Sequence, residues 1–383
     1  MAVVRRRDRR FDERMRSPVF GLLLAAACAS PAAVEPTVPA STFVIGAGKP
    51  VADLPGEPHL KNVRQLTFDG ENAEAYWSND GTQLILQRRN GEMPADQIYV
   101  LDLASGAMKQ ISTGGRTTCS YFLQGDKKVV YASTHHTGNE PPPVAKRTGR
   151  SYVWNVHREY DLFIANADGS GTTQLTKEPG YDAEATVCAV TGALVFTSVR
   201  DGDLELYTME PDGSNVKRIT NRPGYDGGAF FSHDGRKLVF RSAYPRTPDE
   251  AKEDVALLGQ ALVRPSHMEI TVCNRDGSGF KQVTNNGCAN FAPYYLPDDK
   301  RIIFSSNFEG MRIAQQGGDH KAARNFDLFV VSEDGGEPQR ITNSPDFDGF
   351  PVFSPNGRYL VFASNRYAQK EGETNVFVAE WVD

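Results

Sequence analysis

The sequence predicts an all-β protein, a six-bladed β-propeller whose ring is closed by pairing an N-terminal strand with the C-terminal blade. The first observation is a strand–turn–strand pattern that recurs six times along the 383 residues, as AYWSNDGTQLILQ, SYFLQGDKKVVYA, ATVCAVTGALVFT, AFFSHDGRKLVFR, PYYLPDDKRIIFS and PVFSPNGRYLVFA. The second is a further hairpin after most copies, such as DLFIANADGSGTTQLT and ELYTMEPDGSNVKRIT. Four antiparallel strands, named a to d in chain order, over roughly 45–65 residues are typical of a propeller blade.

Each part of the repeat has a local cause. The a and b strands are short apolar runs rich in β-branched and aromatic residues, which favour extended backbone. The turn between them carries Gly, Asp or Asn, and the c and d strands are joined by Asp-Gly or Ser-Gly turns. These residues tolerate the positive φ angles that tight hairpins need. The repeat therefore predicts two short hairpins in each blade, joined by a b–c connection of variable length.

Closure of the ring follows from a mismatch between the two ends of the repeat. The segment VRQLT at Val63–Thr67 repeats the piece that ends other blades, such as KRIT at Lys217–Thr220. The last unit, in contrast, stops after its c strand in NVFVAEWVD. We therefore expect Val63–Thr67 to pair with Asn375–Trp381, because an open propeller would leave two exposed strand edges.

The motifs SPNGRYLVFASNR, SHDGRKLVF and DLFVVSEDGG resemble the TolB-type propeller repeat, from about residue 60 to the end of the chain. The resemblance implies the fold more than an activity, since propellers host many unrelated functions. TolB proteins also carry an α/β domain ahead of the propeller, for which residues 1–60 leave no room. A role in the Tol-Pal envelope system is therefore not carried over.

The sequence predicts three segments: a signal over residues 1–28, a flexible tether over 29–60 and the propeller over 61–383. MRSPVFGLLLAAAC resembles a bacterial lipoprotein signal, in which Cys28 becomes the lipidated first residue. Ordinary cleavage after Ala29 and a disordered cytosolic tail are the alternatives, and initiation at Met1 or Met15 stays open. Lipidation implies the periplasm or outer membrane, with membrane contact only through the anchor, and ordinary cleavage implies secretion. The tether is rich in Ala, Pro and Val without periodicity.

Composition narrows the function classes. A net charge of -6 argues against nucleic-acid binding, which normally requires a basic face. Four cysteines lie in the repeat region, and we expect buried free thiols, although three disulfide pairings stay possible: Cys119, Cys188, Cys273 and Cys288. No GxSxG motif is present, so nucleophilic catalysis of that type is not expected.

Three long b–c inserts are the main functional clue: His135–Tyr160, Tyr244–His267 and Phe308–Phe326. Long loops on a regular scaffold are usually functional or disordered. All three fall on the face that also carries the d–a turns, here called the insert face. Within the second insert, Thr247 and Glu250 predict a capped helix, with Val255 on an apolar side that packs over the blade rim or docks a partner.

A column of polar residues recurs just before the a strands and is here called the turn column: Asn72, Thr117, Asp182, Asp226, Asn290 and Asp348. We expect it to ring the mouth of the central channel, with Glu74 and Glu184 two residues deeper. Converging oxygen atoms can bind a hard divalent cation or a cationic group. The alternative is that each side chain caps its own turn.

Histidines and arginines on the insert face supply further candidates. His135 and His136 lie on the first insert and His320 on the third, and the three can converge on one transition-metal ion. Oligogalacturonate lyases are similar in placing a metal on histidines of this face. Arg200 and Arg366, at strand ends, can receive a carboxylate or an acidic glycan, or can simply be solvated.

The sequence favours a binding module over an enzyme, with a protein, peptide or glycan held on the insert face. The alternative is a metal-dependent enzyme on the same face, an oligogalacturonate-lyase-like polysaccharide lyase. No cofactor is expected beyond a divalent cation.

Overall fold

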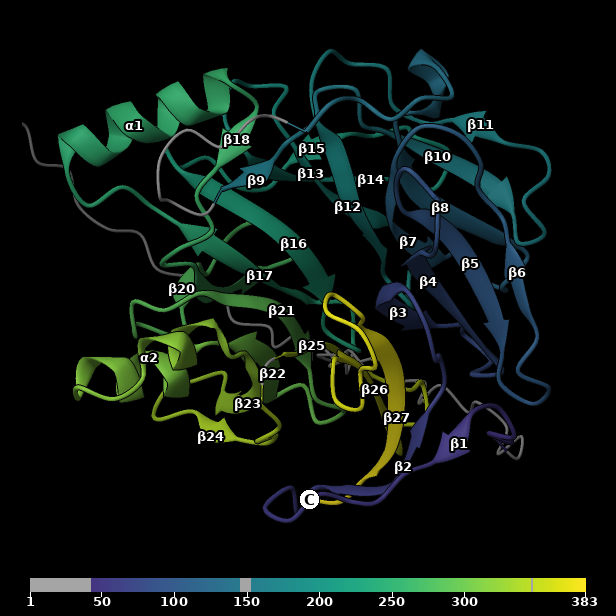
Figure 1. Ribbon diagram of the computed structural model, residues 1–383. Helices are drawn as coiled ribbons and strands as arrows, with labels where there is room; N and C mark the ends of the chain where they lie inside the picture. Colours follow the sequence, from purple (N-terminus) through teal and green to yellow (C-terminus); the bar gives the residue numbers. More distant parts are fainter. Residues whose placement is uncertain (1–42, 145–152, 346) are drawn as a thin grey trace, which may run out of the picture. The chain divides into compact units, whose positions relative to one another are not determined.

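Six antiparallel sheets repeat around a common axis in the computed structural model, which describes residues 43–144, 153–345 and 347–383 (Figure 1). The first strand of each sheet contacts the first strands of the two neighbouring sheets, and the last of these contacts, between blade six and blade one, completes the ring. Each sheet is one blade, with its a strand innermost. The predicted six-bladed β-propeller is therefore confirmed.

The first three blades follow one another along the chain. Blade one consists of β3 (Glu71–Trp77), β4 (Gln83–Arg89), β5 (Gln97–Asp102) and β6 (Met108–Gln110). Blade two consists of β7 (Thr117–Phe122), β8 (Lys128–Ser133), β10 (Asp161–Asn166) and β11 (Thr173–Gln174). Blade three consists of β12 (Asp182–Val187), β13 (Leu194–Ser198), β14 (Glu205–Met209) and β15 (Lys217–Arg218).

The remaining blades continue the order until the last one, which borrows strands from the start of the chain. Blade four consists of β16 (Tyr225–Phe231), β17 (Lys237–Ala243), β19 (Glu269–Asn274) and β20 (Lys281–Gln282). Blade five consists of β21 (Asn290–Tyr295), β22 (Arg301–Ser306), β23 (Asp327–Ser332) and β24 (Gln339–Arg340). Blade six consists of β25 (Asp348–Phe353), β26 (Tyr359–Ser364), β27 (Asn375–Trp381), β2 (Leu60–Gln65) and β1 (Lys49–Pro50).

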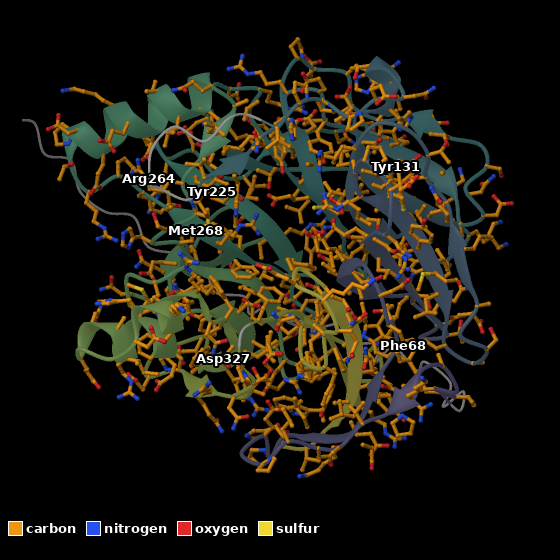
Figure 2. The ribbon with its side chains drawn as sticks, in the orientation of Figure 1. Phe68, Tyr131, Tyr225, Arg264, Met268 and Asp327 are labelled. Carbon is orange, nitrogen blue, oxygen red and sulfur yellow. The ribbon has the colours of Figure 1, made fainter. Side chains whose placement is uncertain are left out.

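The b strands hold the core together because side chains on both of their faces are buried. Their centres read as unbroken apolar runs, for example Leu194–Phe196 in β13 and Leu238–Phe240 in β17, and every residue of these runs is 0% exposed. A short continuous apolar run is typical of a strand that is covered on both sides. Side chains fill the spaces between the blades, with Tyr131 visible within blade two (Figure 2).

Ring closure occurs as the sequence predicts. β2 pairs with β27, with Leu60 opposite Trp381 and Gln65 opposite Phe377. The hydroxyl near the end of each d strand accepts a hydrogen bond of 2.8–2.9 Å from a backbone N–H of the neighbouring c strand. These hydroxyls belong to Ser112, Thr176, Thr220, Thr284, Thr342 and Thr67. The recurring Ser or Thr therefore locks the outer strand, and Thr67 performs this role for blade six.

The residues ahead of β2 are structured, in contrast to the flexible tether predicted from the sequence. Phe43 packs against Trp77 of blade one and Tyr359 of blade six, with ring centroids 6.2 and 6.1 Å apart. Glu57 is 1% exposed and accepts hydrogen bonds from Arg366 at 3.0 and 3.2 Å. The prediction of a flexible tether to residue 60 is therefore wrong for residues 43–60, which form a strap across the closure. The predicted signal segment, with Cys28, lies outside the described residues.

The inserts form structure that the sequence analysis only partly predicts. Helix α1 (Pro248–Gly259) begins at Thr247, whose hydroxyl accepts a hydrogen bond from the N–H of Glu250, as expected. No residue of α1 is fully buried and Val255 is 73% exposed, so the expected packing of its apolar side is limited to its C-terminal end, where half-buried Leu258 packs against the cluster that contains Met268. The other insert helices are η1 (His135–Thr137), α2 (Phe308–Gln315) and η2 (His320–Arg324).

Two inserts also pair with each other across blade three. β9 (Trp154–Asn155), from the insert of blade two, pairs with β18 (Leu262–Val263), from the insert of blade four. Neither helix within the described ranges has the length and apolar composition that a membrane crossing requires. The four cysteines of the propeller are free thiols, as expected.

We predict that Glu57→Gln destabilises the protein by about 2–3 kcal/mol, because Arg366 is buried and loses one of its two carboxylate partners. The measurement is the free energy of unfolding in urea. The control is Glu371→Gln, an exposed carboxylate in the b–c connection of the same blade. Equal stabilities of the two variants would contradict the role assigned to the strap.

Candidate functional site

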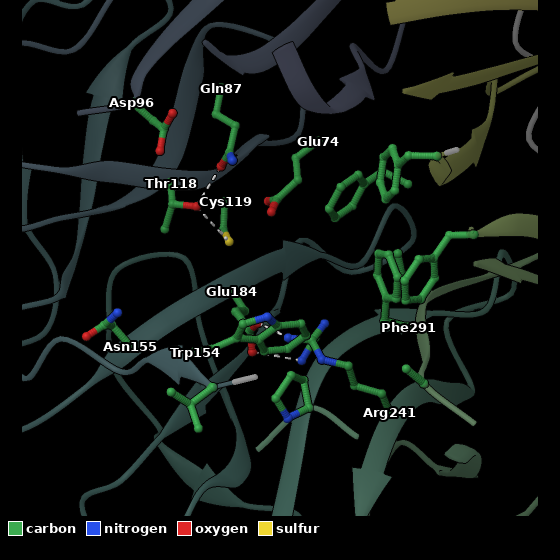
Figure 3. Close-up of a pocket in the computed structure, with 18 of the residues that line it drawn as sticks. Glu74, Gln87, Asp96, Thr118, Cys119, Trp154, Asn155, Glu184, Arg241 and Phe291 are labelled. Carbon is green, nitrogen blue, oxygen red and sulfur yellow. Dashed lines mark hydrogen bonds and ion pairs between the residues drawn. The ribbon is translucent and has the colours of Figure 1, made fainter. Parts of the chain in front are cut away.

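A cavity of about 1500 Å³ occupies the centre of the propeller and contains side chains from the a strands and from the inserts (Figure 3). Trp154 of β9, Arg264 beyond β18 and Arg324 of η2 all line it. These residues lie on the three inserts, so the cavity lies on the insert face. This is the face on which the sequence predicts ligand binding.

The innermost strands all carry a β-bulge at the same place, and this bulge aims one residue of each blade at the cavity. Pairing between the a and b strands shifts register there in every blade. The residue at the shift has a φ angle between 48° and 60° and lines the cavity. These six residues, here called the bulge ring, are Glu74, Cys119, Glu184, Gly228, Ala292 and Phe350.

Aromatic rings fill the channel two residues further along the a strands. This group, here called the aromatic plug, consists of Tyr76, Tyr121, Phe230 and Tyr294. The rings of Tyr76 and Phe230 belong to opposite blades, yet their centroids are 5.7 Å apart. Because these rings meet across the axis, the plug closes the channel below the bulge ring. The cavity therefore has an aromatic floor.

One side of the cavity is an apolar surface contributed by blades five and six. Four rings with centroids 5.2–6.3 Å apart form this surface, here called the phenylalanine wall. Its members are Phe291, Phe326, Phe347 and Phe350, and all of them line the cavity. Figure 3 shows Phe291 across the open space from Glu74. The bulge ring is thus acidic on one side of the axis and apolar on the other.

A buried ion pair forms another part of the cavity lining, beside the aromatic floor and the phenylalanine wall. The guanidinium of Arg241, from the b strand of blade four, bonds the carboxylate of Glu184 in blade three. It also lies over the rings of Trp154 and Tyr225, 5.3 and 5.5 Å from their centroids. A Cβ atom at Gly228 would lie 2.2 Å from Nη1 of Arg241. Glycine at this place in the bulge ring therefore makes room for the guanidinium.

Glu74 occupies a different environment from Glu184. Burial, which acts more strongly than the nearby charge of Glu184, raises the pKa of Glu74 to about 7. The thiol of Cys119 is its hydrogen-bond partner and opposes this rise, as does the charge of Arg241. Burial also raises the pKa of Cys119 well above its usual value, so that residue is a neutral thiol. The two groups form a weakly charged polar patch opposite the phenylalanine wall.

The turn column does not ring the channel mouth as predicted. All six side chains are at most 1% exposed, and only Asn290 lines the cavity. Asp182 is paired with Arg200 at 3.0 Å, and Asp348 with Arg366 at 3.0 Å, so both arginines serve structural ion pairs. Asp226 accepts a hydrogen bond from Tyr244, and burial raises the pKa of Asp226 to about 8.

The remaining members of the turn column also take partners inside the blades. Asn290 accepts a hydrogen bond from Ser306, and Asn72 accepts one from Arg88. The expected cation site at this column is therefore not formed, because the oxygen atoms are used within the blades. Glu74 and Glu184, predicted to lie deeper in the channel, do line the cavity.

The predicted metal ligands are not brought together. His136 pairs with Asp161 at 3.1 Å, and Nδ1 of His135 lies 2.8 Å from the hydroxyl of Ser133, both within blade two. His320 begins η2 in the insert of blade five. Across the described ranges, no group of three or more His, Cys, Asp or Glu side chains is arranged to hold a metal ion.

Sequence reasoning missed the phenylalanine wall, Arg241 and the contribution of Trp154. The sequence contains one indication of the phenylalanine wall. In FDGFPVF, Phe350 interrupts the alternation of apolar and polar residues that a half-buried strand normally shows. Arg241 offers a second, as a lone charge inside the apolar b strand KLVFRSA. A charge there requires a buried partner. Trp154 gives no such signal, because it is placed by the two-residue pairing of β9 and β18.

The fold and the channel together define a self-closed six-bladed propeller with a cavity open on one face. Comparison with known proteins shows that this propeller is TolB-like. No protein-family model matches the sequence. The chain is 24% identical to a protein TolB homolog from Chlorobium luteolum (strain DSM 273 / BCRC 81028 / 2530), over 40% of this chain and 45% of that protein. The match therefore spans less than half the length of this relative.

Solved structures support the same fold. The putative TolB from Agrobacterium tumefaciens superposes with a TM-score of 0.52 at 17% identity, over 82% of this chain and 91% of that chain. An oligogalacturonate lyase in complex with manganese has a TM-score of 0.47 at 14% identity, over 88% of this chain and 99% of the lyase. The first likeness concerns fold alone, and the second is too low to support an argument.

We predict that Glu74→Gln removes a pH dependence of stability. The carboxyl ionises near pH 4.5 in the unfolded chain and near pH 7 in the fold, so the folded state binds more protons between these values. Stability should therefore fall as pH rises from about 4.5 to 7. Relative to the wild type, the variant should gain about 1–3 kcal/mol in urea unfolding on going from pH 4 to pH 8. Parallel pH profiles of the two proteins would contradict this.

Proposed function

We propose that this chain is a binding module whose channel cavity receives part of a protein, peptide or glycan ligand from the insert face. The observation that carries the proposal is a cavity of about 1500 Å³ with an aromatic floor and the phenylalanine wall. Small-molecule pockets are commonly about 300–1,000 Å³, and they combine apolar walls with a few polar groups. The cavity is large enough for several amino-acid or sugar units, and Glu74 and Arg241 supply polar groups within it.

Binding is favoured over catalysis by the state of the reactive groups. The cavity contains one thiol from the bulge ring, Cys119, and its pKa is raised by burial. A thiol is a poor nucleophile compared with a thiolate. His135 and His136 have separate partners within blade two, and no group of three or more His, Cys, Asp or Glu side chains among the described residues could hold a metal ion, so no observation there favours the lyase alternative.

The location of the protein is also a proposal. The apolar run ahead of Cys28 supports export and lipidation at that cysteine, which would hold the propeller at the periplasmic side of a bacterial membrane. Secretion after ordinary cleavage is the alternative. A tethered module of this kind presents its cavity to ligands of the cell envelope.

The channel is tested by removing one ring of the phenylalanine wall. Ligands are selected with the wild-type protein from a phage-displayed peptide library and from a glycan array. Phe291→Ala should weaken their binding by roughly tenfold, or about 1.4 kcal/mol, because an aromatic contact is lost. The control is Phe280→Ala, a ring in the c–d hairpin of blade four that does not line the cavity. No ligand from either source, or equal binding by both variants, would contradict a channel site.

Lipidation is tested separately in a bacterium that processes lipoproteins. The wild-type chain should incorporate labelled palmitate and fractionate with membranes. Cys28→Ala should abolish the label and release the protein, since the thiol is the acceptor of the lipid. Labelling that persists in this variant would rule out an anchor at Cys28.

A further inference from the structure

We propose that the channel selects ligands that carry a protonated amine, held between the carboxylate of Glu74 and the phenylalanine wall. An alkylammonium group of this kind occurs at a peptide N-terminus and on a lysine side chain. The inference rests on the proposed binding function and adds the chemical class of the group that enters the cavity.

The bulge explains the backbone at Glu74, but it does not explain why a glutamate stands there. Its φ angle is 51°, a left-handed conformation that side chains other than Gly, Asn and Asp rarely adopt. The same place in the bulge ring is occupied by Gly228 in blade four and by Ala292 in blade five, so the bulge does not need a glutamate. In blade three the equivalent Glu184 is explained by its pairing with Arg241. Within the described ranges, Glu74 has no corresponding cationic partner.

The other carboxylates that line the cavity are paired with arginines. Glu71 pairs with Arg89, and Asp96 lies 3.8 Å from Arg116. Among the described residues, no lysine, arginine or histidine lies within ion-pair distance of Glu74, whose hydrogen-bond partner is the thiol of Cys119. A buried carboxylate is stabilised when an opposite charge lies nearby. A cationic ligand would supply the charge that the described part of the chain does not.

The same cavity already shows how it holds a cation. Arg241 is fixed by one carboxylate, that of Glu184, and by the rings of Trp154 and Tyr225. Glu74 and the phenylalanine wall offer this combination a second time, on opposite sides of the open space (Figure 3). A cation that is desolvated against aromatic faces is attracted by their quadrupoles. The cavity therefore suits a ligand in which an ammonium group is attached to an apolar body.

The charges around Glu74 determine how binding should depend on pH. Glu184 and Asp96 raise the pKa of Glu74, while Arg241 and the Cys119 thiol lower it, and burial outweighs them all. With a pKa of about 7, the carboxyl is mostly ionised at pH 8 and mostly protonated at pH 5.5. A lysine side chain or 2-phenylethylamine stays protonated at both values, since the pKa of such an amine is near 10, whereas a peptide N-terminus, with a pKa near 8, is about half protonated at pH 8. Amine binding should therefore strengthen as pH rises through 7.

The test uses three probes of one shape, 2-phenylethylamine, 2-phenylethanol and 3-phenylpropanoate, titrated by calorimetry at pH 8. We expect the amine to bind at least tenfold more tightly than the alcohol or the acid. Glu74→Gln should reduce amine affinity to that of the alcohol without changing alcohol binding. The matched control is Glu71→Gln, on the same strand at the cavity edge and already paired with Arg89, which should keep the preference.

The wild-type protein provides a second measurement that does not depend on folding of the variant. Its affinity for the amine should fall about tenfold from pH 8 to pH 5.5, while alcohol binding stays constant. Equal binding of amine and alcohol, tighter binding of the acid, or an amine preference that survives in Glu74→Gln would overturn the proposal. If the alcohol binds without any amine preference, the channel still binds ligands and this inference alone fails. If no probe binds, the proposed channel site fails with it.

Discussion

Pairing of β2 with β27 joins the two ends of the described chain within one blade, and the geometry of the centre depends on that pairing. Each a strand is held against the a strands of its neighbours only while the ring is complete. Closure is reinforced by the hydroxyl of Thr67 and by the strap, in which Glu57 reaches the buried guanidinium of Arg366. The cavity is thus a product of closure, because its walls come from all six blades.

Closure also converts one repeated backbone irregularity into a ring of different side chains. The bulge recurs in each a strand, so the six positions are equivalent in backbone but not in chemistry. Blades one to three contribute Glu74, Cys119 and Glu184, whereas blades five and six contribute Ala292 and Phe350. This asymmetry gives the cavity a polar side and an apolar side. The repeated blades form the propeller, and the different residues at the six equivalent bulge positions determine what the cavity can bind.

The repeat could be predicted from the sequence because each hairpin has its own turn residues and apolar strands. Closure could be predicted because the last blade lacks a d strand and Val63–Thr67 supplies one. The strap could not be predicted from the sequence, because residues 43–60 lack periodicity and are ordered by distant partners such as Arg366. The turn column was misplaced because Asp182 and Glu184, two residues apart, would share a face in a regular strand. The bulge changes the direction of the strand between them, and a bulge is not apparent from residue types.

Ligand selection in the channel depends most on Glu74, a half-buried carboxyl on the cavity lining with no cationic partner among the described residues. The most direct measurement is the titration of its side-chain carboxyl by carbon NMR, assigned by comparison with Glu74→Gln. We expect a midpoint near pH 7 in the free protein, and a lower midpoint when 2-phenylethylamine is bound. A midpoint near 4.5 that the amine does not change would contradict the account.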